Sequence, residues 1–428
     1  MRRVCGAAAV TVFIGAVVGG LALITPISSV WRSDPLVLES ELLAFNQPRA
    51  TAVGALVSVV SAAWADTVRT ATVAWLIALC GAVALLVNHS LFESMSVASL
   101  STWNYIDAVA AGALLGGLAA VAVYRASVTA AYVLGVLAAV LIGDFAQGPG
   151  SGSSGQLRSP VVLPIGESPP LWLIWPAVVL VAFGVFRDRG RRIAEFESGE
   201  VPLGPISAAV VVVGVTLLDS EWVARHGDTA IRIVVAVAVT VAGAVAAAFL
   251  LPGRDGTLVL LAVAFVSAGG TIVAVSLPRW MVPVLFVCVA AGFTLGRVRP
   301  APLAGMAATL LIALFAVLTA GRLEHVTVIP TVGTAAVSTI AGYCYGSALP
   351  RTAPSVMAGL AVLFVPPAGV AMRVRDFSHL SHSPQWSGDH AVVSNAAPGW
   401  GAAAVTLGCG AGVLVLRRFR GDDAAAEP

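Results

Sequence analysis

Residues 229–251 read TAIRIVVAVAVTVAGAVAAAFLL, and this stretch decides the class of the fold. It holds one charged residue, Arg232, and is otherwise almost entirely apolar and small. About 20 such residues in a helix cross the hydrocarbon core of a bilayer, so the stretch is long enough to span one. The rest of the chain has the same character, since 58% of its 428 residues are hydrophobic and 11% are charged. The mean hydropathy of +0.93 excludes a water-soluble domain and predicts an all-α integral membrane protein.

Thirteen further apolar stretches flank this one, separated by short polar segments. We therefore predict a polytopic helical bundle of about 14 transmembrane helices. Twelve or thirteen crossings are the alternatives, because the second stretch is short and the ninth and tenth almost adjoin. The predicted spans are residues 4–25, 50–65, 71–88, 106–124, 128–143, 170–186, 204–219, 229–251, 257–277, 280–296, 301–320, 329–349, 354–371 and 399–416.

The arginines set the predicted orientation. All 24 basic residues are arginine, and 15 of them fall in the segments that face the cytoplasm if the N-terminus is inside. The outer segments are longer in total and hold only nine, which matches the positive-inside rule. We predict that both termini are cytoplasmic, with a tryptophan belt at the outer ends of the spans. Basicity carried by arginine alone, in a chain rich in Ala, Val and Gly, is typical of high-GC bacterial genomes and favours the plasma (inner) membrane.

The longest inner loop, residues 187–203, begins with RDRGRR and divides the chain unequally. It is either a boundary between two bundles or simply a strong cytoplasmic anchor. The prediction is a six-helix bundle over residues 1–186, a linker over 187–203, an eight-helix bundle over 204–416 and a tail over 417–428.

Two patterns inside the spans bear on packing. Gly112 and Gly116 form a small-xxx-small pair, which lets helix backbones approach closely. Pro366-Pro367 lies within the thirteenth span and should kink or break it, because neither proline has an amide hydrogen to donate. Broken helices often line binding sites in transporters, although a purely structural kink is the equal alternative.

Residues 62–70, AAWADTVRT, carry a family resemblance. An aspartate that ends the second span, followed three positions later by an arginine, resembles the cytoplasmic loop motif of the major facilitator superfamily of membrane transporters. The family's glycines are missing, and a threonine stands where its first basic residue is expected. In that family the aspartate pairs across the bundle and stabilises one state of the alternating-access cycle. The resemblance, which covers residues 4–186, implies that Asp66 and Arg69 form a conformational lock; an ordinary inner loop is the alternative.

Charges deep in the membrane are scarce. Asp107, Asp144 and Asp219 all lie near the predicted outer ends of spans. Because carboxylates in a bilayer are costly and usually functional, we assign Asp107 to substrate or proton coupling. An interfacial cap is the alternative for Asp107 and the preferred interpretation of Asp144. This charge map favours a facilitator, or a flippase for an amphiphile, over a strongly proton-coupled pump.

All six histidines are predicted to lie outside the membrane, three of them in the last outer loop. Arg373 and Arg375 in that loop form a possible anion-binding site on the outer face, since guanidinium groups suit phosphate and carboxylate. His379 and His382 could share a metal ion, but a solvated polar loop is the favoured interpretation. Neither a metal site nor a cofactor is predicted.

The leading prediction of function is a multi-pass transporter that moves a small molecule or amphiphile by alternating access. Membrane lipids and that unknown substrate are the expected partners, and no nucleic acid is expected. One alternative is an enzyme, because the acidic first outer loop is similar to that of integral-membrane glycosyltransferases that use polyprenyl-phosphate sugars. Asp34 would then be the general base, with Arg373 and Arg375 holding the phosphate. A non-catalytic partner in cell-envelope assembly is the other alternative.

Overall fold

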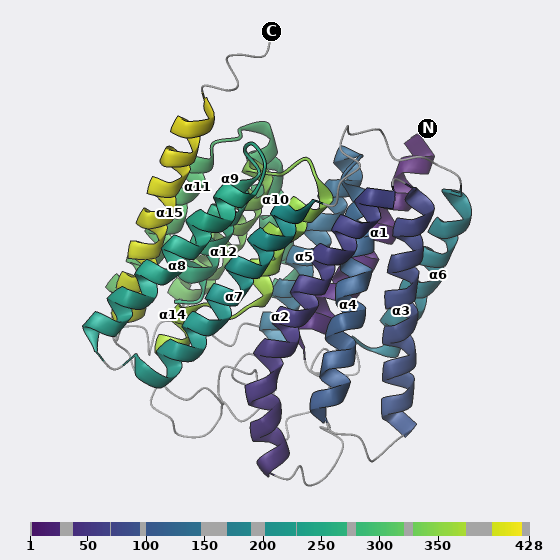
Figure 1. Ribbon diagram of the computed structural model, residues 1–428, viewed down its shortest axis with the longest axis horizontal. Helices are drawn as coiled ribbons and strands as arrows, with labels where there is room; N and C mark the ends of the chain where they lie inside the picture. Colours follow the sequence, from purple (N-terminus) through teal and green to yellow (C-terminus); the bar gives the residue numbers. More distant parts are fainter. Residues whose placement is uncertain are drawn as a thin grey trace.

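The computed structural model describes residues 2–25, 37–68, 70–94, 100–146, 169–189, 202–227, 229–271, 280–320, 328–373 and 396–421. Within these ranges the chain forms α-helices and one short 3-10 helix (Figure 1). The helices are α1 (Arg2–Ile24), α2 (Val37–Val68), α3 (Ala71–Ser94), α4 (Leu100–Ala122), α5 (Ala126–Ala146), α6 (Leu171–Arg187), α7 (Leu203–His226), α8 (Ala230–Leu250), α9 (Gly256–Gly269), α10 (Met281–Val298), α11 (Pro302–Thr319), α12 (Val328–Ser347), α13 (Ala353–Ala361), η1 (Val362–Phe364), α14 (Ala368–Arg373) and α15 (Ala397–Gly421).

The all-α polytopic prediction is confirmed. Thirteen of the predicted spans each overlap one helix, and the span 354–371 is divided among α13, η1 and α14. Among the described residues, eleven segments are long and apolar enough to cross a membrane. Helices α6 and α9 are apolar but shorter. The start of α1 and the end of α15 lie at the same end of the bundle, as an even number of crossings requires (Figure 1). We call this the inner end, following the predicted orientation, which stays a prediction along with the number of crossings.

Two helices differ instructively from their predicted spans. Helix α2 begins at Val37, although the predicted span begins at residue 50, because the polar residues that precede the apolar stretch continue the same helix. The predicted break at Pro366-Pro367 is confirmed. Helix α13 ends at Ala361, η1 ends at Phe364, and α14 begins at Ala368. The thirteenth span is therefore two short helices with non-helical backbone between them.

Glycines bring two pairs of helices into close contact. In α4, a Cβ atom at Gly112 would lie 2.3 Å from the carbonyl oxygen of Gly54 in α2, so Gly112 carries the backbone contact that its spacing predicts. In α12, a Cβ atom at Gly342 would lie 2.0 Å from the carbonyl oxygen of Val289 in α10. Side chains are excluded at both positions, and the α2–α4 and α10–α12 pairs pack in the same manner.

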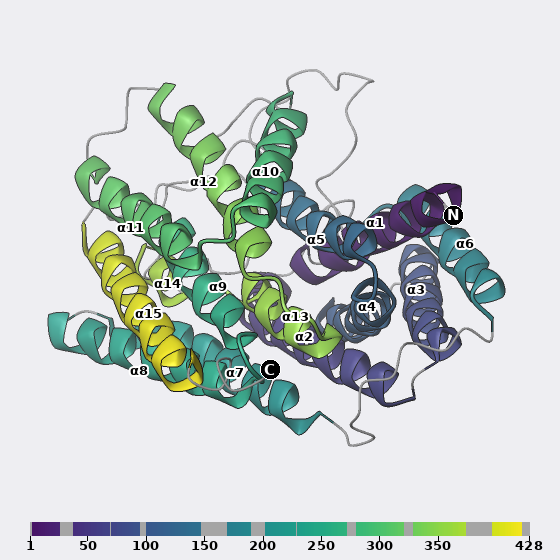
Figure 2. The same ribbon diagram turned by 90° about the horizontal axis from the view of Figure 1, so that it is seen from above.

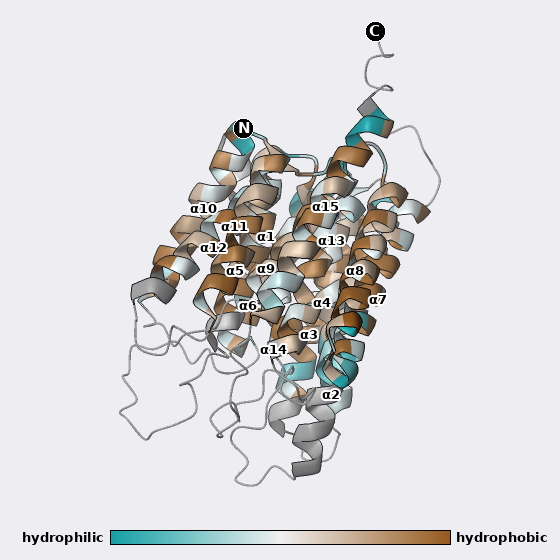
Figure 3. Ribbon diagram, turned by 90° about the vertical axis from the view of Figure 1, so that its left-hand side faces the viewer, coloured by the Kyte–Doolittle hydropathy of each residue, from teal (hydrophilic) through white to brown (hydrophobic). Residues whose placement is uncertain are grey.

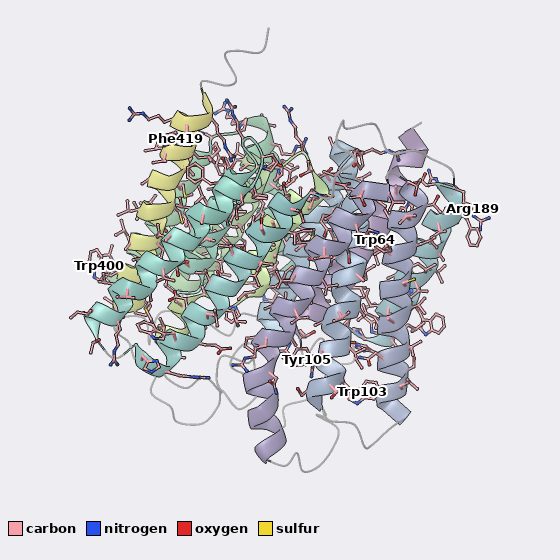
Figure 4. All side chains as sticks on the ribbon, in the orientation of Figure 1. Trp64, Trp103, Tyr105, Arg189, Trp400 and Phe419 are labelled. Atoms are coloured by element: carbon pink, nitrogen blue, oxygen red, sulfur yellow. The ribbon has the colours of Figure 1, made fainter. Side chains whose placement is uncertain are left out.

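The surface of the bundle is apolar between its ends. Figure 3 shows hydrophobic residues over most of the helices and hydrophilic ones gathered toward the ends. Trp172, Trp175, Trp280 and Trp400, all predicted at outer ends, are more than half exposed. Trp103, from the same predicted belt, is instead buried. A surface with so many exposed large apolar side chains suits a lipid solvent and not water.

Helices α7 and α8 join two larger groups. Helices α1–α6 pack mainly on one another, as do α9–α12 and α15 (Figure 2). Helix α13, which we count with the second group, packs mainly on α2, α4 and α7, and α14 packs mainly on α7. Helix α7 lies against α2 of the first group and against α13 and α14 of the second, while α8 lies against α9 and α15. Near the outer end, Arg49 of α2 makes a two-pronged ion pair with Glu221 of α7, with both N–O distances at 2.9 Å. The α7–α8 pair therefore contacts both groups.

Candidate functional site

The first candidate site lies at the inner end, around Asp66. The Tyr124 hydroxyl, from the turn between α4 and α5, donates to Asp66 Oδ1 at 2.9 Å. The backbone amide of Ala353, the first residue of α13, also hydrogen-bonds to this carboxylate. The first amides of a helix lack partners within it, and Thr352 supplies no side-chain cap to α13. Asp66 therefore caps α13 from another helix, where a negative charge also suits the helix dipole.

A second carboxylate holds the same helix start from the other side. Asp255, directly before α9, accepts a hydrogen bond from Thr352 Oγ1 at 3.4 Å and is also bonded by the Ser355 side chain and the Arg351 backbone. Burial raises the pKa of the Asp255 carboxyl, and these hydrogen bonds oppose that shift. The start of α13 is thus held between Asp66 of the first group and Asp255 of the second.

A further link joins the inner ends on the α5–α10 side. Arg297, in the last turn of α10, donates through Nη1 to the carbonyl oxygen of Ala126 at 3.4 Å, and Ala126 begins α5.

The phenol of Tyr124 has a raised pKa, first because of burial and then because of Asp66. The Tyr124 hydroxyl therefore keeps its hydrogen and remains a donor to Asp66. Arg69, the predicted partner of Asp66, lies outside the described residues.

Asp107 is engaged by two neighbours at the outer side. It is only 1% exposed, Asn88 Nδ2 donates to Oδ1 at 2.6 Å, and His89 Nε2 lies 2.8 Å from Oδ2. The position of His89 outside the membrane stays a prediction; in the structure α3 continues to Ser94, and the His89 ring is largely buried against Asp107. Both partners of Asp107 come from α3, so the contact ties α3 to α4 within the first group.

The second candidate site is a cavity of about 270 Å³ between the two groups of helices. Its walls come from α1, α2 and α5 on one side, and from α9, α10, α12 and the broken α13–α14 segment on the other. No charged residue lines it, and the lining is mostly Val, Leu, Phe, Gly and Pro. Gln47, Thr51 and Ser338 are its polar side chains. We call it the central cavity.

Gln47 is the unusual member of this lining. Its side chain is 5% exposed, and Oε1 has no hydrogen-bond partner in the part of the chain that the structure describes. A buried amide oxygen without a partner costs about 1–3 kcal/mol, so such a group is normally satisfied by something. In contrast, the hydroxyl of Thr51 already donates to the carbonyl of Gln47 at 2.9 Å. Gln47 is therefore the lining residue with an unmet hydrogen-bonding capacity, and its side chain has to turn for the enclosed Oε1 to meet a molecule in the central cavity.

Several sequence-predicted residues cannot be placed. Asp34, Arg375, His379 and His382 lie outside the described residues, as does most of the 187–203 loop. Arg373 is the last residue of α14, but its side chain is not described. The roles predicted for these residues therefore stay predictions. Sequence reasoning missed Gln47 and Asp255, which lie in polar segments next to predicted spans and had no signal beyond their residue type.

Comparisons with known proteins agree with this architecture at the level of fold. A search of family profiles and a search of curated proteins each found no match. A solved structure described as an auto-inhibited POT family peptide transporter matches with a TM-score of 0.51 and 15% identity, over 98% of each chain. A structure of the major facilitator superfamily transporter FucP in its outward conformation matches with a TM-score of 0.46 and 14% identity, over 97% of this chain and 98% of that one.

The chain therefore has the fold of a multi-pass membrane transporter. The likeness of fold to the peptide transporter covers nearly the whole chain, whereas the sequence resemblance covered only residues 4–186. At this level of identity the fold is what is shared.

Proposed function

We propose that this protein is an alternating-access transporter for a small, uncharged and largely apolar solute that carries a hydrogen-bonding group. The central cavity carries this proposal, since helices of both groups line it and it has no charged side chain. Ligand sites of this kind are typically apolar, with a few polar groups that orient the ligand. Gln47 is the proposed anchor, because a ligand that donates to its buried amide oxygen would remove the cost of leaving it unpaired.

The inner-end contacts are the proposed lock of the cycle. Asp66 and Arg297 each connect one group of helices to the other at the inner end, while the central cavity lies toward the outer ends of α1, α2, α5 and α9. In this proposal, opening toward the cytoplasm requires that α13 leave Asp66 and that α5 leave Arg297. Arg69 is proposed to assist Asp66, as the family resemblance implies.

The moving bodies are proposed to be α1–α6 and α9–α15. The proposed location is the plasma membrane, supported by the arginine-only basicity of the chain.

The proposed substrate class excludes permanent ions. An ion in the central cavity would find no charge of opposite sign among its lining residues.

A binding screen followed by uptake tests this proposal. The purified protein is heated with neutral amphiphiles, zwitterionic dipeptides and sugar phosphates, and compounds that stabilise it are then tested for counterflow in proteoliposomes. We expect neutral amphiphiles with a hydrogen-bond donor to stabilise the protein and to be transported. Gln47→Leu should weaken their binding by about tenfold, the equivalent of one hydrogen bond, because leucine keeps the volume and removes the acceptor.

Thr309→Val is the matched control. Thr309 is fully buried in α11, its hydroxyl donates to the carbonyl of Gly305, and it does not line the central cavity. This change removes a buried hydroxyl and should leave ligand affinity unchanged. Transport of the charged compounds alone, or equal affinity in Gln47→Leu and the parent protein, would refute the proposal.

A further inference from the structure

Asp219 is a buried carboxylate within a candidate membrane span, and no cation among the described residues pairs with it. It lies in α7, inside the candidate span Leu203–His226, and is 6% exposed. The hydroxyl of Thr240 in α8 donates to Asp219 Oδ2. Among the described residues, no arginine or histidine pairs with it. A single hydroxyl donor does not compensate for a full negative charge in so apolar a place.

The charged groups nearby are engaged elsewhere. On α7 itself, Glu221 is held by Arg49 of α2, and Arg225 lies 3.9 Å from the same carboxylate. His226 Nδ1 donates to the Trp222 carbonyl, and Arg232 of α8 donates to the His226 carbonyl. The residues of α9, η1, α14 and α15 that line the space beside Asp219 carry no charge, and neither does any residue of α13. Arg373, which follows Met372 at the end of α14, is the nearest charged residue in the sequence of that helix, and its side chain is outside the described part of the structure. Among the residues that the structure describes, none supplies a counter-charge to Asp219.

A small cavity lies beside this carboxylate. Its volume is about 20 Å³, roughly the space of one water molecule. Hydroxyl groups of Thr216, Thr240 and Ser267 line it, together with residues on both sides of the break between α13 and α14. Thr216 already donates its hydrogen to the Val212 carbonyl at 2.7 Å, so it cannot also donate to Asp219. The site thus presents oxygen lone pairs and very few donors.

The small cavity and the central cavity share a wall. Val266 of α9 and Pro367 of the broken segment line both of them. The backbone from Val362 to Gly369 contributes to both linings as well. A change in the position of this broken segment therefore alters both cavities together, which is the geometry that coupling between two sites needs.

We propose that Asp219 is a proton-binding site, and that its protonation is coupled to the central cavity through the broken α13–α14 segment. The carboxylate takes up one proton to become a neutral carboxyl group, with no other bond formed or broken. Thr240 then donates to the remaining acceptor oxygen. The binding site stands on the buried carboxylate and its cavity alone, whereas the coupling to transport rests on the proposed function. This assignment makes the transporter proton-coupled, against the expectation from the sequence.

Carbodiimide labelling tests the binding site without requiring transport. Dicyclohexylcarbodiimide is an apolar reagent that attacks protonated carboxyl groups, and peptide mass spectrometry locates its adducts on the purified full-length protein in nanodiscs. We expect an adduct at Asp219 in mildly acidic buffer, its loss in alkaline buffer, and no change when sodium chloride replaces choline chloride. Asp219→Asn should remove this adduct only. Thr240→Val should let labelling persist to higher pH, because the donor that favours the charged form is gone.

Two other outcomes of the labelling experiment would overturn the proposal. Protection of Asp219 by sodium at constant pH would mean that a sodium ion, and not a proton, neutralises the carboxylate, which overturns the proposal. Absence of the adduct at every pH, while other carboxyl groups are labelled, would overturn it too. Either failure leaves the proposed transport function standing, because labelling does not depend on a substrate.

The coupling between Asp219 and the central cavity is tested at the broken α13–α14 segment, which lines both cavities. Leu363 lines the central cavity within the broken segment, so Leu363→Cys, in a variant whose own cysteines are serine, reports the accessibility of that wall to a methanethiosulfonate reagent. We expect the modification rate to change severalfold between mildly acidic and alkaline buffer, and this dependence to vanish when Asp219→Asn is added. A pH-independent rate in the parent, or a dependence that survives in Asp219→Asn, would refute the coupling.

Discussion

At the scale of single residues, the N-terminus of α13 is capped by a carboxylate from another helix and not by the residue that precedes α13. Helix α13 starts with Ala353 and Pro354, and the hydroxyl of Thr352 is directed to Ser355 at 2.7 Å and not to the helix backbone. The missing cap is Asp66, which belongs to another helix. A cap is worth about 1 kcal/mol, enough to bias two conformations without freezing one of them.

Asp66→Asn should weaken the inner-end contact while leaving the protein folded. Asparagine keeps an acceptor oxygen but loses the negative charge that the start of α13 and the Tyr124 hydroxyl favour. We expect uptake to be lost at an unchanged protein level. Spin labels at Phe186→Cys and Val298→Cys, both exposed at the inner end, should show a new population at longer distance by electron–electron double resonance.

Asp188→Asn is the control for that measurement. Asp188 is also an inner-end aspartate, but it accepts from Trp75 Nε1 at 3.1 Å, and both residues belong to the α1–α6 group. Its substitution should leave the distance between the two labels unchanged. An unaltered distribution in Asp66→Asn, or full uptake, would remove Asp66 from the lock.

At the scale of helices, backbone contact and not side-chain interdigitation sets the closest approaches. The α2–α4 contact runs along Gly54, Gly112 and Gly116, where any Cβ atom would lie within 2.4 Å of a backbone oxygen of the partner helix. Backbone cannot move aside as a flexible side chain can, so these positions accept only glycine. The α10–α12 contact repeats this arrangement at Gly292 and Gly342.

Gly112→Ala should destabilise the protein by about 1–3 kcal/mol through overpacking. Gly214→Ala is the matched control, since Gly214 also lies within a transmembrane helix but a Cβ atom there would meet nothing within 4 Å. Thermal unfolding of both variants in the same detergent gives the comparison. Equal melting temperatures for the two would show that the α2–α4 contact is looser than the structure has it.

The sequence predicts the positions of the helices along the chain better than it predicts the contacts between them. Apolar stretches of sufficient length determine where a chain crosses lipid, and a Pro-Pro pair must interrupt a helix wherever it falls. Gln47 was not predicted as a site residue, because its polar segment gave no sign that it continues α2. Asp255 escaped because its partner Thr352 is 97 residues away in the sequence, and only the packing of α9 against α13 brings them together.

At the scale of the whole molecule, the α7–α8 pair contacts both groups, which also contact each other directly through α13 with α2 and α4 and through α10 with α5. Its ionic contact, Arg49 with Glu221, is two-pronged, which is the strongest geometry for such a pair. Asp107 belongs to the first group alone, so neither Asn88 nor His89 can transmit its state across the bundle directly. The groups are joined at the inner end, on α7, and by the contacts of Tyr132 with Met357 and of Phe13 with Phe286.

Arg49→Met should loosen α7 from α2 and cost about 1.5–3 kcal/mol, the range for a hydrogen bond to a charged group. The reversed pair, Arg49→Glu with Glu221→Arg, should recover part of that loss, because the two side chains face each other directly. Thermal unfolding of the two variants and the parent measures both effects. If the reversed pair is no more stable than Arg49→Met, then the contact is not ionic in origin.

The placement of α7 leaves the two flanks of the bundle covered in different ways. A molecule of two bundles has two lateral seams facing the bilayer, and α7 covers the one between α2 and the α13–α14 segment. On the opposite flank, α5 meets α10 directly, with Phe13 of α1 in edge contact with Phe286 at 5.8 Å between ring centres. Under the proposed function, a solute that enters from the lipid on this flank has to separate Phe13 from Phe286 first.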